Sequence, residues 1–363
     1  MLNKGEIVAI WLDIFETVNI KRKYQILNAY KLPEELFKNF KKDARMFESF
    51  LDSNIFSKMS YALDADFINK QVVEYNKMGV ELVTINSKDY PKLLKEVATP
   101  PLVLYCKGDL KLLNTECLAV VGTRRATRYG KKVTENFTKT LVHNGFTIVS
   151  GMADGIDTQA HETALAEDGK TIAVLGGGIN ELYPSSNITL GKTIAEKGLL
   201  ISEYKPDQKP AAFHFPIRNR IIAGMSKGVL ITEADLKSGS MHTKEYALEA
   251  NRDLFIVPGN IDSPQSLGCN AVIKALQGCM VTAPEDILEV YGKTNNYKEF
   301  VKQNNFQLSL DEQVVINCLG SEEVHYDELL DKTNLDTKTL NSLLTTMQVR
   351  GIIKKLPGNL YSI

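Results

Sequence analysis

The stretch FHFPIRNRIIAG, residues 213–224, is the densest part of the region 119–282, on which the fold of this chain depends. It places aromatic rings, two arginines and an asparagine ahead of an apolar run. Three glycine-rich turns precede it, at Gly122, Gly151 and Gly176, and each turn follows a short apolar segment. Together these features indicate one platform that binds a nucleotide or a polynucleotide.

Short apolar runs recur through this region and predict buried strands. They lie at Leu118–Val121, Thr147–Val149, Thr171–Leu175, Leu199–Ser202, Val229–Thr232 and Leu254–Val257. Segments with helical spacing separate them, as in 130–143 and 154–166. Continuous apolar strands joined by helices predict an α/β fold with a parallel sheet covered on both faces. Ligands of such sheets bind at the carboxyl ends of the strands, where the glycine turns lie.

The bulk composition describes a protein with a full-sized core and no global charge. The chain has 363 residues, enough for two or three domains, with 44% hydrophobic and 24% charged residues and a net charge of −1. Positive charge that binds a polyanion must therefore be local. The five cysteines form no Cys-x-x-Cys pair, which indicates a reducing compartment and no structural zinc. The apolar run 7–12 is too short to span a bilayer, so we expect a cytoplasmic protein without membrane contact.

The segments on either side of this region predict separate modules. Residues 1–63 have helical spacing and predict a packing or interaction module, because the turn at 18–21 lacks the glycines of a DNA-binding hairpin. Residues 64–291 form the main domain, which begins with a helix and two strands. The polar stretch 292–305 predicts a linker, and 306–363 predicts three helices and a hairpin.

Three helices and a hairpin are typical of a winged helix. Its predicted recognition helix, Lys338 to Arg350, has only those two basic residues. Because winged helices bind proteins as well as DNA, this favours a protein-contact or regulatory role.

A basic cluster follows the first glycine turn. Residues 122–132 hold five basic residues and no acidic one, beginning with Gly122, Arg124 and Arg125. A glycine turn that opens a helix presents backbone N–H groups and the positive end of the helix dipole, and arginines there bind phosphate in bidentate fashion. We favour phosphate binding over a solvated basic helix start.

The second and third glycine turns favour an architectural or phosphate-cradling role. Ser150 and Gly151 begin a tight strand-to-helix turn, and Gly176, Gly177 and Gly178 follow the next strand. Neither turn completes a dinucleotide fingerprint. Lys170 precedes a strand, so it does not belong to a P-loop, and we interpret it as a lone phosphate-facing charge.

Phe215, Arg218, Asn219 and Arg220 suit single-stranded nucleic acid. Exposed aromatics stack on bases while arginines hold phosphates. The alternative is a buried Phe215 with both arginines in structural ion pairs, to Glu233 or Glu203.

No credible catalytic set is present. Ser240, His242 and Glu233 form a triad only on paper, because residues two apart at a helix start do not face each other. We expect no catalytic residue, no metal and no cofactor.

The combined motifs resemble the bacterial DNA-processing protein A family, DprA or Smf. The motifs are G-T-R-x-x-T-x-Y-G (122–130), S-G-x-A-x-G-I-D (150–157), G-x-G…Y-P-x-x-N (176–187), F-P-x-R-N-R-I-I-A-G (215–224), E-A-x-x-x-S-G-S (233–240) and V-P-G-N (257–260). The resemblance implies an extended Rossmann-like core, preceded by a helical SAM-like module and followed by a winged helix. It also implies a homodimer that binds single-stranded DNA and loads RecA recombinase onto it in natural transformation, without enzymatic activity.

The resemblance also assigns roles to residues. Arg124 and Lys170 would grip phosphate, and Phe215, Arg218, Asn219 and Arg220 would line the DNA pocket. Ser150, Gly151 and Gly176 to Gly178 would shape its floor. The competing interpretation is a nucleotide-hydrolysing enzyme of the lysine-decarboxylase-like class, with Glu233 at the ribose, although the P-G-G-x-G-T-x-x-E loop of that class is absent.

Overall fold

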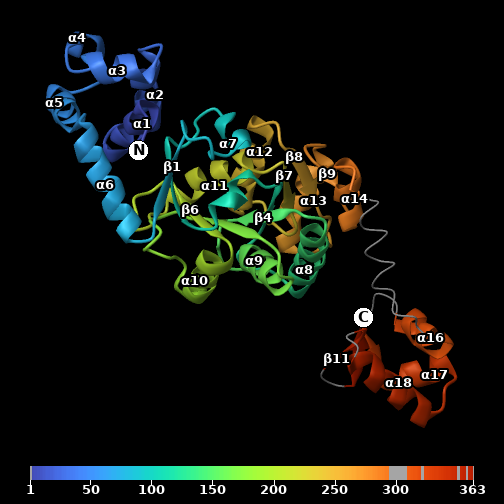
Figure 1. The fold of residues 1–363 in the computed structure, drawn as a ribbon. Helices are drawn as coiled ribbons and strands as arrows, with labels where there is room; N and C mark the ends of the chain where they lie inside the picture. The colour runs from blue at the N-terminus through green and yellow to red at the C-terminus, as the bar shows by residue number, and fades with distance from the viewer. Residues whose placement is uncertain (1, 294–308, 320–322, 350–351, 357–358, 363) are drawn as a thin grey trace. The chain divides into compact units, whose positions relative to one another are not determined.

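The computed structural model describes residues 2–293, 309–319, 323–349, 352–356 and 359–362. The chain forms two compact units, Met1–Thr294 and Asn295–Ile363, and each is described by itself (Figure 1).

The first unit is built on one large sheet. Within residues 2–293 the sheet has nine strands in the order β1-β2-β6-β5-β4-β3-β7-β8-β9. The strands are β1 (Glu81–Thr84), β2 (Val103–Gly108), β3 (Cys117–Val121), β4 (Thr147–Ser150), β5 (Thr171–Val174), β6 (Leu199–Ser202), β7 (Gly228–Ile231), β8 (Asp253–Ile256) and β9 (Cys279–Met280). The strands β6, β5, β4, β3, β7, β8 and β9 are parallel to one another. The remaining two, β1 and β2, form an antiparallel pair, and β2 is antiparallel to β6. The predicted parallel α/β sheet is therefore confirmed.

Burial explains why these short segments form strands. All residues of β3 to β7 are buried, so each strand has an apolar or small side chain on both faces. The helices α8 (Arg128–His143), α9 (Ile156–Ala166) and α10 (Ile188–Lys197) cover the lower face in Figure 1, and α11 (His214–Gly224) and α12 (Ser240–Glu249) cover the upper face. The strands are thus shielded from water on both sides, as continuous apolar runs require.

The helix α8 shows how the chain encodes this packing. Its buried residues include Thr134, Phe137, Thr138 and Leu141, which recur at the three- and four-residue spacing of one helix face. The side chain of its N-cap residue, Thr127, accepts a hydrogen bond from Gly130 N at 3.1 Å. This capping fixes where the helix begins.

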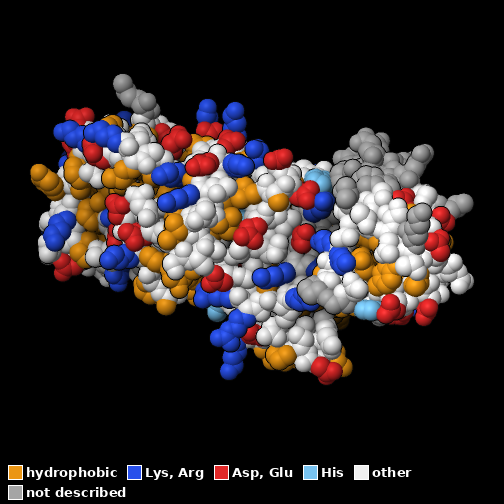
Figure 2. All heavy atoms as spheres, turned by 90° about the horizontal axis from the view of Figure 1, so that it is seen from below, with side chains coloured by type: hydrophobic (Ala, Val, Ile, Leu, Met, Phe, Trp, Pro, Cys, Tyr) orange, Lys and Arg blue, Asp and Glu red, His pale blue; other side chains and the backbone are white. Residues whose placement is uncertain are grey.

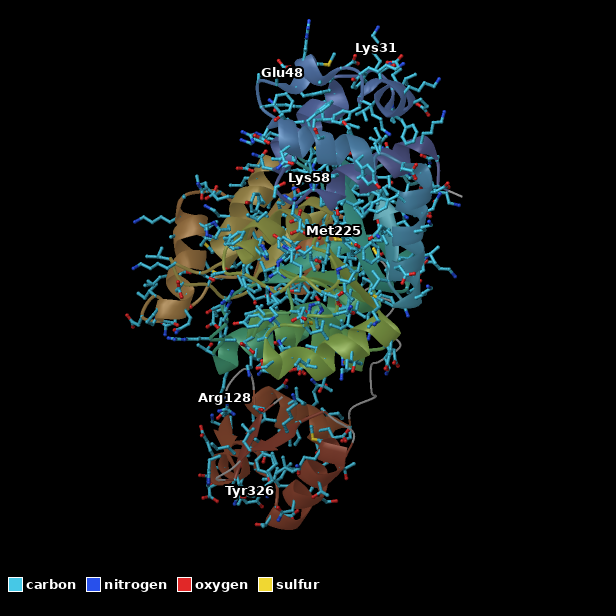
Figure 3. All side chains as sticks on the ribbon, turned by 90° about the vertical axis from the view of Figure 1, so that its left-hand side faces the viewer. Lys31, Glu48, Lys58, Arg128, Met225 and Tyr326 are labelled. Atoms are coloured by element: carbon cyan, nitrogen blue, oxygen red, sulfur yellow. The ribbon has the colours of Figure 1, made fainter. Side chains whose placement is uncertain are left out.

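The N-terminal helices pack against the antiparallel edge of the sheet. They are α1 (Lys4–Ile14), α2 (Ile20–Asn28), α3 (Pro33–Asn39), α4 (Ala44–Phe47), α5 (Ser53–Ala62) and α6 (Ala65–Lys77). The hydroxyl of Tyr105 on β2 donates to Asp13 Oδ2 at 2.8 Å, and that of Tyr24 donates to Pro100 O at 2.9 Å. Lys31 and Glu48, labelled in Figure 3, lie in connections between these helices, on the side away from the sheet. The boundary between 63 and 64 falls between α5 and α6, and a separate helical domain stays a prediction.

The second unit has the elements of a winged helix. Its helices are α16 (Leu310–Leu319), α17 (Tyr326–Thr333) and α18 (Thr337–Val349). Strands β10 (Val324–His325), β12 (Leu360–Ser362) and β11 (Lys354–Leu356) pair in that order. The three helices and the hairpin are therefore confirmed. Most of the predicted linker, Arg350, the side chain of Lys338 and residues 357–358 of the hairpin turn lie outside the described residues.

No helix in the described ranges is both long and apolar enough to cross a membrane.

Candidate functional site

An open cleft lies where the order of the strands reverses. β3 has β4 on one side and β7 on the other, so the loops that follow β3 and β7 diverge. The cleft between them has a volume of about 410 Å³. Its lining comes from four segments: residues 121–125 after β3, Ala153 and Asp157 after β4, residues 212–222 on and before α11, and residues 235–243 at the start of α12.

The loop after β3 is held in place by a buried carboxylate. Glu233 O accepts from Thr123 N at 2.7 Å, and its carboxylate accepts from Thr127 N at 2.8 Å and from Thr127 Oγ1 at 2.6 Å. The same carboxylate packs against Gly130, which leaves no space there for a Cβ. The start of α8, expected to cradle phosphate, thus already has an anion, and a second anion there would be repelled. The basic side chains of the loop remain available.

Arg124 and Arg125 are those side chains. Both are exposed, both line the cleft, and within the described residues neither forms an ion pair. The guanidinium carbon of Arg124 lies 5.7 Å from the centroid of the Phe215 ring, within cation–π range. A cation and an aromatic ring therefore stand side by side in the cleft.

The Phe215 ring forms the aromatic wall of the cleft. It packs on the backbone of Gly176, where an added Cβ would lie 2.6 Å from Phe215 Cδ1. Tyr183, which is half exposed, lies next to this ring at a centroid distance of 5.4 Å and lines a smaller neighbouring pocket. Gly177 and Gly178 are buried and pack against the segment 205–210, and Gly178 N donates to Gln208 O at 2.7 Å. Gly176 therefore supports the wall, and none of the three glycines lines the cleft.

Arg218 is a buried clamp for the loop after β4. Its guanidinium donates to Gly151 O at 2.8 Å and to Val174 O, and Asn219 Oδ1 accepts from its Nε at 3.1 Å. Burial lowers the pKa of Arg218 to about 10, so the group stays charged at neutral pH. Arg218 thus joins the ends of two strands and exposes only an edge to the cleft.

Asp157, which is also buried, is the carboxylate whose charge interacts with that of Arg218. Asp157 Oδ2 accepts from Gly151 N at 3.1 Å and from Ala153 N at 3.3 Å. Burial raises the pKa of this carboxyl, and the charge of Arg218 opposes that rise. Beside them, Ser150 Oγ donates to Val120 O at 2.6 Å and ties β4 to β3. Ser150 and Gly151 therefore shape the floor through the backbone.

Two further predicted site residues, Arg220 and Lys170, lie away from the cleft. Arg220 is buried and pairs with Glu203, which is one of the structural ion pairs weighed above. Lys170 is exposed just before β5, at the amino ends of the parallel strands. A four-residue strand spans roughly 13 Å, so Lys170 lies on the opposite edge of the sheet from the cleft.

The α12 side of the cleft was not predicted to belong to the site. It contributes Asp235, Lys237, Ser238, Gly239, Ser240 and Thr243. The S-G-S turn after the fifth predicted strand was a usable signal, since turns at this edge share one site. Thr243 carried no signal, because a single threonine inside a helix is unremarkable.

The hydrolase interpretation gains no support from the cleft. Glu233 is only 2% exposed, and it does not line the cleft. Ser240 Oγ lies 2.8 Å from Ser238 Oγ, and among the described lining residues no hydroxyl is hydrogen-bonded to a histidine. A nucleophile next to a base, which such chemistry needs, is not assembled there.

The face of the molecule drawn in Figure 2 carries mixed charge. Figure 2 shows Lys, Arg, Asp and Glu side chains interspersed over the face that it presents. The cluster at Arg124 and Arg125 is therefore a local basic feature of a chain with net charge −1.

Comparison with protein families matches both units. Residues 81–292 match the model described as DNA recombination-mediator protein A, and residues 302–359 match the DprA winged helix domain.

Individual relatives agree with these matches. The chain is 38% identical over 286 residues to protein Smf of Escherichia coli, covering 76% of each chain. It is 40% identical over 235 residues to DNA processing protein DprA of Streptococcus pneumoniae, covering 64% of this chain and 80% of that one.

Two solved structures are also similar. The X-ray structure of DprA from Streptococcus pneumoniae superposes with a TM-score of 0.67 at 33% identity, over 79% of this chain and 98% of that one. The structure of DprA from Helicobacter pylori, described as giving its single-stranded DNA binding mode, superposes with a TM-score of 0.54 at 35% identity, over 59% and 96%.

Proposed function

The chain belongs to the DNA recombination-mediator protein A family, and on that premise we propose that it binds single-stranded DNA in the cleft beside β3 and loads RecA onto the bound strand. The family resemblance that the sequence motifs carried is thereby confirmed. Binding, loading and the residues involved are the proposal.

The observation that carries this proposal is the pairing of Arg124 with Phe215. An exposed guanidinium that forms no ion pair with any described residue lies next to an aromatic ring in an open cleft. Stacking of a base on such a ring is tolerant of sequence, and the neighbouring cation neutralises the phosphate attached to that base. The Helicobacter pylori relative, whose structure concerns single-stranded DNA binding, supports the choice of single-stranded DNA as the ligand.

Salt dependence of oligonucleotide binding tests the proposal. Fluorescence anisotropy of a labelled oligothymidine should give tight binding that falls steeply with salt, with weak binding to the matching duplex. Each neutralised phosphate contributes about −0.7 to the log–log slope on a single strand, so Arg124→Ala should reduce the slope by roughly that amount.

Lys170→Ala is the matched control for Arg124→Ala. It removes one exposed cation from the opposite edge of the sheet, so we expect wild-type affinity and slope. If Arg124→Ala binds like wild type at every salt concentration, or if Lys170→Ala loses as much as Arg124→Ala, the cleft is wrongly assigned.

RecA loading needs its own test, because no RecA-contact surface is readable from residue types. We expect the protein to accelerate RecA filament formation on single strands covered by single-strand-binding protein. Arg124→Ala should lose this activity in proportion to its lost DNA affinity. Strand binding without any acceleration would separate the binding function from the loading function.

We also propose a cytoplasmic homodimer. Our candidate for its surface is the helix α13 (Leu267–Lys274) with the residues that follow it: Val272 is core, whereas Leu276, just after the helix, is 91% exposed. Leu276→Glu should therefore shift the mass measured by light scattering towards the monomer without unfolding the protein. An unchanged dimer mass would move the interface elsewhere.

A further inference from the structure

The α12 side of the cleft holds a cluster of hydroxyl groups that the proposed function does not use. Ser238, Gly239, Ser240 and Thr243 all line the cleft. Asn219 on α11 connects this side to the aromatic wall, because its Nδ2 donates to Gly239 O at 3.2 Å. The hydroxyl cluster and the Phe215 ring thus belong to one continuous cavity.

Thr243 is the most informative member of this cluster. Its side chain is only 1% exposed, yet it lines the cleft one turn inside α12. Its hydroxyl has no hydrogen-bond partner among the described residues, not even the backbone carbonyl one turn earlier that other threonines in this chain use. A buried hydroxyl without a partner is costly unless a ligand or water completes it.

The turn before α12 adds further donors to the same place. Ser238 Oγ and Ser240 Oγ lie 2.8 Å apart, so one hydroxyl proton satisfies the other oxygen and the second proton is free to point into the cleft. Gly239, the N-cap residue, has no side chain to cap the helix. The first turn of α12 therefore faces the cleft without the carboxylate that occupies the start of α8.

The charges around this cluster favour an anion. Arg125 and Lys237 are exposed cationic residues that line the cleft on either side of it. Two carboxylates, Asp235 and Asp157, also line the cleft, against four cationic side chains, those of Arg124, Arg125, Arg218 and Lys237. Cationic groups therefore outnumber anionic ones around the cleft.

We propose that Ser238, Ser240 and Thr243 form a phosphate subsite, which holds a phosphate group of the bound strand while a neighbouring base stacks on Phe215. Phosphate oxygens accept several hydrogen bonds at once and prefer a helix start with nearby cations. This inference rests on the proposed function for the identity of the ligand. The phosphate is either an internal diester or a terminal monoester, and the two share the same acceptor chemistry.

Thr243→Val tests the subsite by removing one hydroxyl at nearly constant volume. Loss of one hydrogen bond to a charged acceptor should weaken oligothymidine binding about tenfold. Thr243→Ser, which keeps the hydroxyl, should restore most of that loss.

Thr138→Val is the matched control. Thr138 lies on α8, is fully buried and also has a hydroxyl without a partner, but it does not line the cleft. Its substitution should leave DNA binding unchanged, so a loss common to both valine variants would overturn the proposal. Thermal unfolding followed by circular dichroism shows that each variant is folded before binding is compared.

Oligonucleotides with and without a 5′-phosphate, labelled at the 3′ end, distinguish the two sources of phosphate. Equal weakening of both by Thr243→Val identifies an internal diester, and weakening confined to the 5′-phosphorylated strand identifies a terminal monoester. Wild-type binding of both by the valine variant refutes the subsite.

Calorimetric titration with thymidine monophosphate and with thymidine separates this inference from the proposed function. If the wild-type protein binds neither oligonucleotide but binds the monophosphate in a Thr243-dependent way, the subsite stands and strand binding fails. If it binds strands tightly with no role for Thr243, strand binding stands and the subsite fails.

Discussion

His161 should make the stability of the first unit sensitive to mild acid. It lies on α9 with no exposed surface, and its Nδ1 is 2.7 Å from Thr171 Oγ1. Because the Thr171 hydroxyl donates to Ile148 O at 3.0 Å, its oxygen is the acceptor and His161 Nδ1 carries the proton. Nε2 is then a bare, buried nitrogen that has no hydrogen-bond partner in the described part of the chain. Burial accordingly lowers the pKa of His161 from 6.5 to about 3.

The pH dependence follows from where each state takes up the proton. Between pH 6.5 and about 3 the unfolded chain binds a proton at this histidine and the folded chain does not. The contribution of neutral His161 is therefore complete above pH 6.5 and is lost as the pH falls below it, at about 1.4 kcal/mol per pH unit. From about pH 7.5 to about pH 5 the expected loss is about 2 kcal/mol.

His161→Leu separates the contribution of His161 to the pH dependence of stability from that of the other titrating groups. The variant cannot take up the proton, and Thr171 keeps its hydrogen bond to Ile148 O. Urea unfolding followed by circular dichroism gives the free energy of unfolding of both proteins at the two pH values. The difference between wild type and variant should change by about 2 kcal/mol in favour of the variant at the lower pH. A difference that stays constant would refute the neutral, buried assignment.

Three further predictions follow from close contacts described above. Gly130→Ala should lower the free energy of unfolding by about 2 kcal/mol in urea titration, because its Cβ would displace the Glu233 carboxylate from the two groups it holds. Gly176→Ala should weaken oligonucleotide binding about fivefold, because its Cβ would displace the Phe215 ring. The dependence of affinity on salt concentration should not change, since no cationic side chain moves. A changed salt dependence would contradict this. Arg220→Met should lower the free energy of unfolding by about 3 kcal/mol, because it leaves the carboxylate of Glu203 buried without its partner. Replacing Glu203 with leucine in the same protein should recover most of that loss.

The sheet was readable from the sequence because its strands are buried on both faces. Each predicted strand is a continuous apolar run, and that pattern survives whatever the neighbouring strand is. The two exposed residues of β9 gave no such pattern, and the antiparallel direction of β2 depends on its partner β6. The presence of a strand could therefore be predicted from the local sequence, whereas its direction depends on the tertiary structure.

The candidate site was readable only to the level of segments. Arg218 and Arg220 stand two apart in one motif, but on a helix they point roughly 200° apart, so one clamps the cleft floor and the other faces a different partner. Lys170 precedes a parallel strand, and its own position therefore assigns it to the edge opposite the glycine turns. Thr243 could be assigned to the site only from the structure, in which α12 places it in the lining of the cleft.

The carboxylate of Glu233 also bears on the speed and tightness of ligand capture. Because it fixes the backbone from Thr123 to Thr127 in the folded chain, the conformational entropy of that loop is lost during folding and not on association. A ligand then meets arginines on a rigid base, and only their side-chain rotamers have to be ordered. We expect the free protein and the complex to share the same loop backbone, so that capture proceeds by simple encounter without a slow rearrangement.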